Sequence, residues 1–260
     1  MTDDVQRPEL LGVSGLQMRF GGLLAVDGVD FGVRRNEVFA IIGPNGAGKT
    51  TVFNCVGGFY KPSSGQVLLD GQCITGLPSH LVAQKGLVRT FQNVRLFKQL
   101  TVVENLMVAQ HRQVKSGLLH GLFATPAYRR AEREALERCA HWLDRMGLTQ
   151  FANREAATLS YGHQRRLEIA RCMITKPCLL MLDEPAAGLN PQEKIELQQL
   201  IDGLRCEFGI AVLLIEHDMS LVMGVSDRIL VMEHGRPIVT GKPEAVRNDP
   251  RVIKAYLGED

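Results

Sequence analysis

The sequence that decides the fold is Gly43-Pro44-Asn45-Gly46-Ala47-Gly48-Lys49-Thr50-Thr51, which directly follows the apolar run of residues 38–42. The spacing G-x-x-x-x-G-K-T lets the glycines adopt backbone angles closed to other residues, so that successive N–H groups point at a phosphate at a helix N-terminus. In such a loop Lys49 reaches the β- and γ-phosphates of a nucleotide, and the Thr50 hydroxyl binds Mg²⁺. An ordinary glycine-rich turn is the alternative, but few chance matches would also follow a buried strand.

Composition limits the class of protein. With 260 residues and 45% apolar content, the chain can form one large α/β domain or two small ones. A formal net charge of +2 gives no support for a nucleic-acid-binding surface. No apolar run approaches the roughly 18 residues that span a bilayer, and residues 1–10 are too polar for a signal peptide, so we expect the chain to stay in the cytosol. The six cysteines form no C-x-x-C pair, so we expect no metal other than nucleotide-bound Mg²⁺.

Short β-rich runs alternate with glycine turns between Leu11 and Val33, which predicts an antiparallel β region ahead of the phosphate loop. Phe20 lies in this region, just before Gly21-Gly22. Its ring either stacks on adenine, a contact worth about 1–3 kcal/mol by analogy with nucleobase stacking, or is an ordinary core or edge phenylalanine.

Two later apolar runs end in polar residues. Residues 178–182 and 210–215 are continuously apolar, which is typical of parallel strands buried on both faces. Because ligands of open α/β sheets lie beyond the carboxyl ends of the strands, Asp183, Glu184 and His217 should reach the same edge as the phosphate loop. Asp183 suits Mg²⁺, Glu184 suits polarising the water that attacks the γ-phosphate, and His217 suits a contact with that phosphate. Solvated strand ends and a structural histidine are the alternatives.

The character of the sequence changes between residues 100 and 159. Apolar residues at helical spacing, followed by a strongly charged stretch, predict an α-helical insertion with a solvated face. Before it, Gln92 by itself is most simply a solvated strand end. After it, Ser160 is a plausible helix N-cap, which either leaves N–H groups free for an anion or simply caps a structural helix.

Taken in order, the phosphate loop, Gln92, Ser160-x-Gly162, Asp183-Glu184 and His217 resemble the ATP-binding subunit of an ATP-binding cassette (ABC) transporter over essentially the whole chain. The resemblance implies one α/β domain, residues 1–260, with a P-loop NTPase core of mostly parallel sheet. That core, residues 1–99 and 160–260, would include the antiparallel β region, and residues 100–159 would be the inserted helical subdomain. The resemblance also implies a head-to-tail dimer in which Ser160 and Gly162 contact the ATP held by the partner.

The resemblance assigns roles residue by residue, with ATP and Mg²⁺ as cofactors. Phe20 would stack on adenine, while Thr50, Gln92 and Asp183 would bind Mg²⁺. Glu184 would be the catalytic base, His217 would contact the γ-phosphate, and Gln92 would bind Mg²⁺ or the attacking water. The ATP phosphates would be held by Gly43, Pro44, Asn45, Gly46, Ala47, Gly48, Lys49, Thr50 and Thr51.

A narrower resemblance is to the LivG-type subunit of bacterial branched-chain amino acid importers. It implies ATP-driven uptake of leucine, isoleucine and valine at the cytoplasmic face of the inner membrane. The expected partners are a second, non-identical ATPase subunit, two membrane permeases and, indirectly, a periplasmic amino acid-binding protein; a homodimer is possible in isolation. The segments that carry it are residues 20–26, 58–62, 89–97, 183–191 and 255–259.

Other functions stay open as alternatives. A related transporter could carry another solute, such as other amino acids or urea, or export lipid or lipopolysaccharide. A cassette ATPase acting on DNA or ribosomes would predict a long coiled-coil insertion, tandem cassettes or a basic face, and the sequence shows none of them. A non-hydrolysing cassette is disfavoured because Lys49, Asp183, Glu184 and His217 are all present.

Three residues depart from the general family pattern. Tyr161 and His163 stand where the signature L-S-G-G-Q has its first glycine and its glutamine, and Asn190 stands where a loop aspartate is usual. Similar substitutions are usual in the narrower importer group, so they support that assignment. They also weaken the expectation that both ATP sites of a dimer are equally active.

Overall fold

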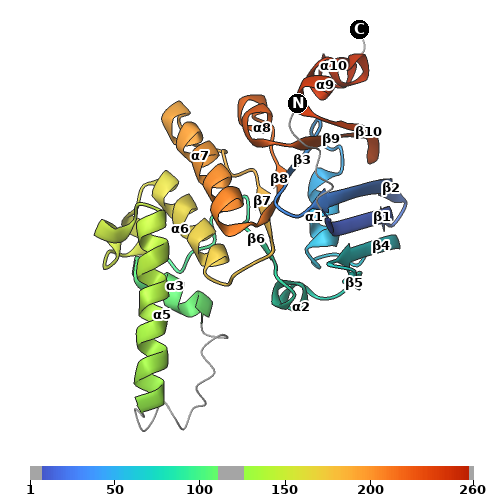
Figure 1. Cartoon of the computed structure of the whole chain (residues 1–260). Helices are drawn as coiled ribbons and strands as arrows, with labels where there is room; N and C mark the ends of the chain where they lie inside the picture. The colour runs from blue at the N-terminus through green and yellow to red at the C-terminus, as the bar shows by residue number, and fades with distance from the viewer. Residues whose placement is uncertain (1–7, 111–125, 258–260) are drawn as a thin grey trace. The chain divides into compact units, whose positions relative to one another are not determined.

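The computed structural model describes residues 8–110 and 126–257, and the chain divides into two compact units (Figure 1). The first, here called the core unit, comprises Met1–Gln92 and Pro177–Asp260. The second, here called the helical unit, comprises Asn93–Lys176.

A six-stranded sheet forms the centre of the core unit, in the order β10-β9-β3-β8-β7-β6. Every residue of β3, β7 and β8 is buried, as their continuous apolar runs predict. In the register, Asp183 pairs with Ile215 and Ile41 pairs with Ile215, so the carboxyl ends of these three strands lie level. The parallel strands are β3 (Val38–Ile42), β6 (Leu87–Arg89), β7 (Leu179–Asp183), β8 (Ala211–Ile215) and β9 (Arg228–Glu233), and β10 (Arg236–Gly241) runs antiparallel to β9.

An antiparallel sheet of four strands completes the β structure of the core unit, in the order β2-β1-β4-β5. Its long hairpin corresponds to the glycine-punctuated region ahead of the phosphate loop, so the predicted antiparallel β region is confirmed. The strands are β1 (Glu9–Phe20), β2 (Leu23–Arg34), β4 (Ser64–Leu69) and β5 (Gln72–Cys73), and the short helix α2 (Ser79–Gln84) follows them.

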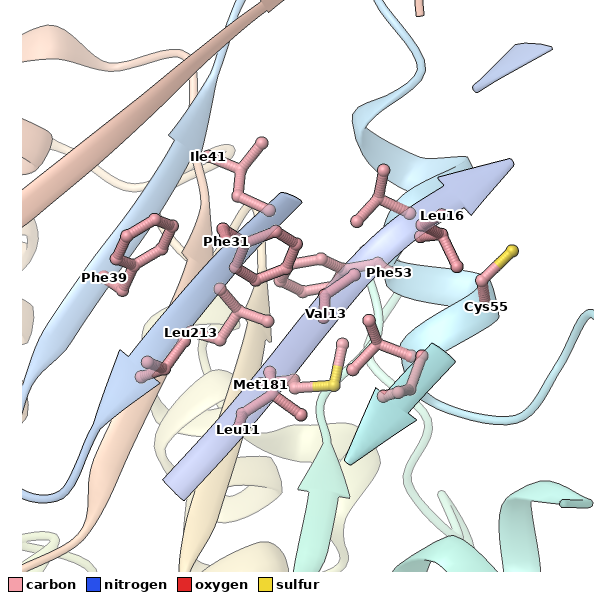
Figure 2. Close-up of a cluster of buried hydrophobic side chains, with 14 of the residues drawn as sticks. Leu11, Val13, Leu16, Phe31, Phe39, Ile41, Phe53, Cys55, Met181 and Leu213 are labelled. Carbon is pink, nitrogen blue, oxygen red and sulfur yellow. The ribbon is translucent and has the colours of Figure 1, made fainter. Parts of the chain in front are cut away.

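One hydrophobic core joins the two sheets and helix α1 (Lys49–Val56), as Figure 2 shows. Phe31 of β2 stacks on Phe39 of β3 with ring centroids 5.4 Å apart, and Phe53 of α1 is fully buried in the same cluster. Because α1 is packed along one face into this core, its N-terminus is held directly after the end of β3. The packing therefore fixes the position of the phosphate loop.

Four more helices of the core unit follow the later strands. They are α7 (Pro191–Phe208), α8 (Met219–Val225), α9 (Pro243–Arg247) and α10 (Pro250–Leu257).

The helical unit contains α3 (Val102–Gln110), α5 (Pro126–Arg145), two 3₁₀ turns, η1 (Thr149–Phe151) and η2 (Ala156–Thr158), and α6 (Tyr161–Met173). The helical unit spans more of the chain than the expected insertion of residues 100–159, because α6 contacts α3 and α5 and so belongs with them. Residues 111–125 of the expected insertion lie outside the described residues. None of the helices in the described part of the chain combines the length and the apolarity that crossing a membrane requires.

Candidate active site

A pocket of about 520 Å³ opens at the phosphate loop of the core unit. Phe20 is 42% exposed and lines this pocket, which excludes the interpretation of Phe20 as a buried core residue. The other lining residues are Leu23, Leu24, Ala25, Asn45, Gly46, Ala47, Gly48, Lys49, Thr50, Thr51, Glu184, His234 and Gly235.

The shape of the phosphate loop depends on its glycines. Gly43, Gly46 and Gly48 have φ angles of 148°, 81° and 93°, which side chains of L-residues rarely allow. A Cβ at Gly43 would lie 2.1 Å from the Met232 carbonyl oxygen, and one at Gly48 would lie 2.7 Å from that of Ala25. The loop leads into the first turn of α1, whose N–H groups have no acceptor within the helix. This cradle fits the phosphates of a nucleotide.

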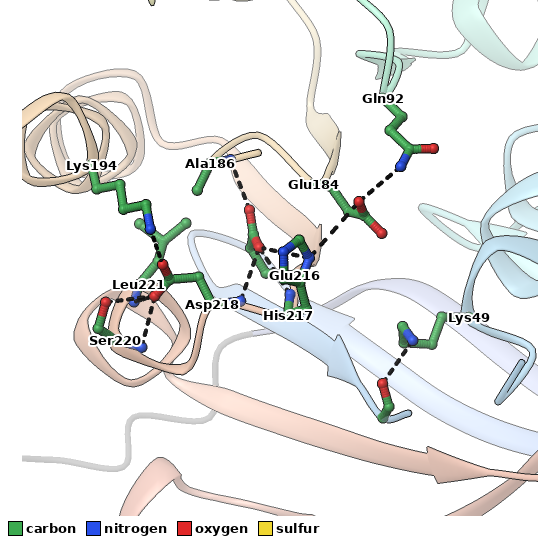
Figure 3. A network of polar contacts seen from close by, with 11 residues as sticks. Lys49, Gln92, Glu184, Ala186, Lys194, Glu216, His217, Asp218, Ser220 and Leu221 are labelled. Atoms are coloured by element: carbon green, nitrogen blue, oxygen red, sulfur yellow. Dashed lines mark hydrogen bonds and ion pairs between the residues drawn. The ribbon is translucent and has the colours of Figure 1, made fainter. Parts of the chain in front are cut away.

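The side chain of Lys49 folds back onto the start of the phosphate loop. Its Nζ donates hydrogen bonds to the carbonyl oxygens of Gly43 at 2.7 Å and Pro44 at 2.9 Å, one of which Figure 3 draws. Burial lowers the pKa of Lys49, and the negative charge of Glu184 partly opposes that change. The ammonium group is therefore held beside the cradle, at the place where phosphate oxygens would sit.

Gln92, Glu184 and His217 come together beyond the ends of the sheet strands (Figure 3). Gln92 Nε2 donates to Glu184 Oε2 at 2.9 Å, and His217 Nδ1 lies 3.8 Å from the same oxygen. Glu184 has a left-handed backbone with φ of 46°, and its N–H donates to the Ile215 carbonyl at 2.9 Å. This tight turn at the end of β7 places the Glu184 side chain in the pocket lining.

Glu216, which the sequence analysis did not single out, connects the loops after β7 and β8. The residue is fully buried, and its Oε1 accepts the N–H of Ala186 at 2.7 Å. Its Oε2 accepts the N–H groups of His217 at 2.8 Å and Asp218 at 3.1 Å. The carboxylate thereby fixes the backbone on both sides of the Glu184–His217 pair.

Oxygen ligands suited to Mg²⁺ are present at the cradle. Thr50 offers a hydroxyl from the first turn of α1, and Asp183 offers a carboxylate from the last position of β7. The described residues contain no cluster of three His, Cys, Asp or Glu side chains that could hold a metal alone. Because Mg²⁺ is usually held by one or two protein oxygens together with substrate phosphates, this set fits a nucleotide-bound ion.

Ser160 and Gly162 belong to the helical unit. Ser160 is the N-cap of α6, and its Oγ accepts the His163 N–H at 3.4 Å. Tyr161, the first residue of α6, is 41% exposed. The start of this helix is thus capped as predicted, with a large aromatic ring at its surface.

Two missed pocket residues, His234 and Gly235, form the two-residue turn of the β9–β10 hairpin. Both have positive φ, as a type I′ turn requires. The Gly235 N–H donates to the Ala47 carbonyl of the phosphate loop at 3.2 Å. No local pattern in the sequence reveals that this turn packs against the phosphate loop.

Comparisons with known proteins agree with this geometry. The profile of the ABC transporter family matches residues 26–187, and that of the branched-chain amino acid ATP-binding cassette transporter matches residues 236–260. The chain belongs to the ABC transporter family. This membership, together with the fold, confirms the predicted P-loop ATPase and identifies the chain as a transport ATPase that binds ATP.

Similar proteins cover nearly the whole chain. The chain is 63% identical over 98% of its length to all of BraF of Pseudomonas aeruginosa, a high-affinity branched-chain amino acid transport ATP-binding protein. It is 61% identical to LivG of Escherichia coli K12, a protein of the same description, over 96% of this chain and 98% of that one. The crystal structure of the ADP conformation of MJ1267, an ATP-binding cassette of an ABC transporter, superimposes with a TM-score of 0.84 at 33% identity, covering 96% of this chain and 99% of that one.

Proposed function

We propose that this chain is the ATP-hydrolysing subunit of an importer of the branched-chain amino acids leucine, isoleucine and valine. The similarity to BraF and LivG over nearly the full length supports this substrate class, as does the match of residues 236–260. On this proposal the subunit lies at the cytoplasmic face of the inner membrane and drives two permease subunits, which receive the amino acid from a periplasmic binding protein.

The proposed working unit is a dimer with a second, non-identical ATP-binding subunit. Ser160 and Gly162 of this chain would contact the ATP held by the partner's phosphate loop, and the corresponding segment of the partner would contact the ATP held by this chain. The 41% exposure of Tyr161 at the start of α6 supports such an interface. Closure of the dimer would then complete each site, so that binding energy assembles the catalytic arrangement.

The residues assigned above would share the binding of ATP and Mg²⁺. The glycine loop and Lys49 would hold the phosphates of ATP, and Phe20 would stack on its base. Thr50 and Asp183, with Gln92, would hold Mg²⁺, which when bound neutralises charge on the phosphate oxygens.

Hydrolysis would depend on Glu184 and His217. Glu184 would accept a proton from water as the water oxygen bonds to the γ-phosphorus and the bond to the β–γ bridging oxygen breaks, which yields ADP and phosphate. His217 would contact the γ-phosphate. The observation that carries this assignment is the meeting of Gln92 and His217 at Glu184 Oε2, with distances of 2.9 and 3.8 Å. Glu184 lines the same pocket as Lys49.

Uptake measurements in cells test the proposed substrate. Cells that lack the gene should lose high-affinity uptake of radiolabelled leucine, and the wild-type gene should restore it while a Glu184→Gln gene should not. Uptake of glutamate serves as the control and should not change. Unchanged leucine uptake in the deletion strain would refute the branched-chain assignment, and a defect in lipopolysaccharide export would favour the lipid-exporting alternative.

A further inference from the structure

Arg89, the last residue of β6, is a buried arginine to which none of the roles above gives a function. Its side chain is 7% exposed and forms an ion pair with Asp183, in which Nη2 donates to Oδ2 at 2.5 Å. Its Nη1 donates to Asn54 Oδ1 of helix α1 at 2.6 Å. Two acceptors from two different elements therefore fix the two ends of the guanidinium fork.

Three phenylalanine rings surround the same guanidinium group. The Arg89 Cζ lies 5.4, 5.3 and 5.5 Å from the ring centroids of Phe53, Phe59 and Phe91. At these distances the rings attract the cation through their negative faces, and they accommodate the planar guanidinium group better than a lysine ammonium. The rings restrict the plane of the group and therefore the direction of its hydrogen bonds.

Asp183 gains a defined orientation from this arrangement. Its side chain is 8% exposed, and among the described residues Arg89 is its ion-pair partner. The Asp183 N–H also donates to Thr90 Oγ1 at 3.4 Å, so Arg89 holds the side chain of Asp183 and the residue after Arg89 holds its backbone. Since Arg89 binds Oδ2, the other oxygen of the carboxylate is left for a further ligand.

Arg89 also connects Asp183 with the other parts of the proposed magnesium site. Asn54 lies on the helix that begins with Lys49 and Thr50, and the segment that leads from Arg89 carries Gln92. One guanidinium group thus joins the phosphate-loop helix, β7 and the segment of Gln92.

We propose that Arg89 is the positioning residue for Asp183, holding its carboxylate in the orientation that the magnesium ion of bound ATP requires. This inference rests on the proposed role of Asp183 as a magnesium ligand. Partners that orient a metal ligand commonly change metal affinity about 10–100-fold when they are removed.

A purely stabilising ion pair is the competing explanation, and it makes different predictions. Replacing both partners of a buried ion pair by apolar side chains is often neutral, whereas removing one partner leaves the other charge buried and unpaired and costs about 3–5 kcal/mol of stability. On that explanation a folded Arg89→Met variant would bind nucleotide normally with and without Mg²⁺. On ours, only the binding that depends on Mg²⁺ would weaken.

The test measures the affinity of the full-length chain for a fluorescent ATP analogue, with Mg²⁺ and with EDTA, in wild type, Arg89→Lys and Arg89→Met. The dissociation constant in EDTA divided by the dissociation constant in Mg²⁺ reports how much Mg²⁺ strengthens binding. We expect both variants to lower this ratio about 10–100-fold, with the affinity in EDTA little changed. Arg89→Lys keeps the charge but loses the second hydrogen bond, so it tests orientation separately from charge.

Two further variants complete the experiment. Arg35→Met removes a surface ion pair in which the side chains of Arg35 and Asp70 are 44% and 62% exposed. This variant should leave the ratio at the wild-type value. Asn54→Ala keeps the ion pair and should give a smaller loss in the same direction, which provides a result if the Arg89 variants do not fold. An unchanged ratio in folded Arg89 variants, or in Asn54→Ala if they do not fold, overturns the proposal.

Asp183→Asn separates this inference from the proposed function. If Asp183→Asn keeps the wild-type ratio, the role of Asp183 in binding magnesium is wrong. If Asp183→Asn loses the effect of Mg²⁺ while the Arg89 variants keep it, only the role of Arg89 is wrong.

Discussion

Replacing Glu216 by glutamine changes one buried carboxylate oxygen into an NH₂ group. The two oxygens of Glu216 accept three backbone N–H groups, one at Oε1 and two at Oε2. An amide has a single oxygen, so at least one N–H donor must face an NH₂ group whichever way the side chain turns. In the better orientation the amide oxygen serves His217 and Asp218, and the Ala186 N–H loses its acceptor.

The expected cost follows from these contacts. A hydrogen bond to a charged group contributes about 1.5–3 kcal/mol, and a buried donor left unsatisfied costs about 1–3 kcal/mol. Counting the loss once, we expect Glu216→Gln to lower the free energy of unfolding by about 2–3 kcal/mol, which for a chain of this size lowers the melting temperature by about 4–12 °C. Turnover should also fall, because the backbone of His217 is released, while ATP affinity should change little, because the phosphate loop is untouched.

Thermal unfolding followed by circular dichroism measures the first effect, and steady-state hydrolysis measures the second. Glu193→Gln is the matched control, because Glu193 accepts the Asn190 N–H at 2.9 Å in a capping box, a position where glutamine serves equally well. Its melting temperature should equal that of the wild type. If Glu216→Gln melts together with this control, the reasoning about the buried carboxylate is refuted.

Three further predictions concern single residues. Glu184→Gln should keep ATP binding and lose turnover by orders of magnitude, as measured by nucleotide titration and phosphate release; near-normal hydrolysis would remove Glu184 from the role of base. Lys49→Ala should abolish ATP binding or hydrolysis, and unchanged values in both assays would contradict the phosphate cradle. Hydrogen bonds from Lys194 and Ser220 hold the pKa of Asp218 well below its usual value, so the stabilisation is present above the unfolded-state pKa of about 3.9 and is lost as the pH falls below it. Asp218→Asn should therefore melt below wild type at pH 7, and the difference in melting temperature should narrow progressively as the pH is lowered below about 4; a difference independent of pH would contradict this ion pair.

The sequence was most informative where one local pattern determines the structure. Residues 38–42, 178–182 and 210–215 are continuously apolar, and the strands that they form, β3, β7 and β8, are buried as predicted. Parallel strands bring their carboxyl ends to one edge, so the meeting of Glu184 with His217 could be anticipated before any distance was known.

The sequence was least informative where a charged residue is buried by partners far away in the chain. In the sequence, Arg89 and Glu216 look like solvated charged residues at strand ends. In the structure Arg89 is buried against Asp183, and Glu216 is buried with the Ala186 N–H as one of its donors. The assignment of α6 to the helical unit likewise depends on contacts with α3 and α5 that no periodicity reveals. Local patterns predict elements, whereas the partners of buried polar groups emerge only from the folded chain.

The left-handed backbone of Glu184 has a consequence for how the protein can evolve. Such a conformation costs on the order of 1 kcal/mol for glutamate, but asparagine and glycine adopt it with less strain. Selection for heat resistance alone would therefore favour asparagine or glycine at position 184, and sequencing the survivors of such a selection would reveal this. Only the simultaneous demand for ATP hydrolysis would retain the glutamate, so stability and activity compete at this one residue.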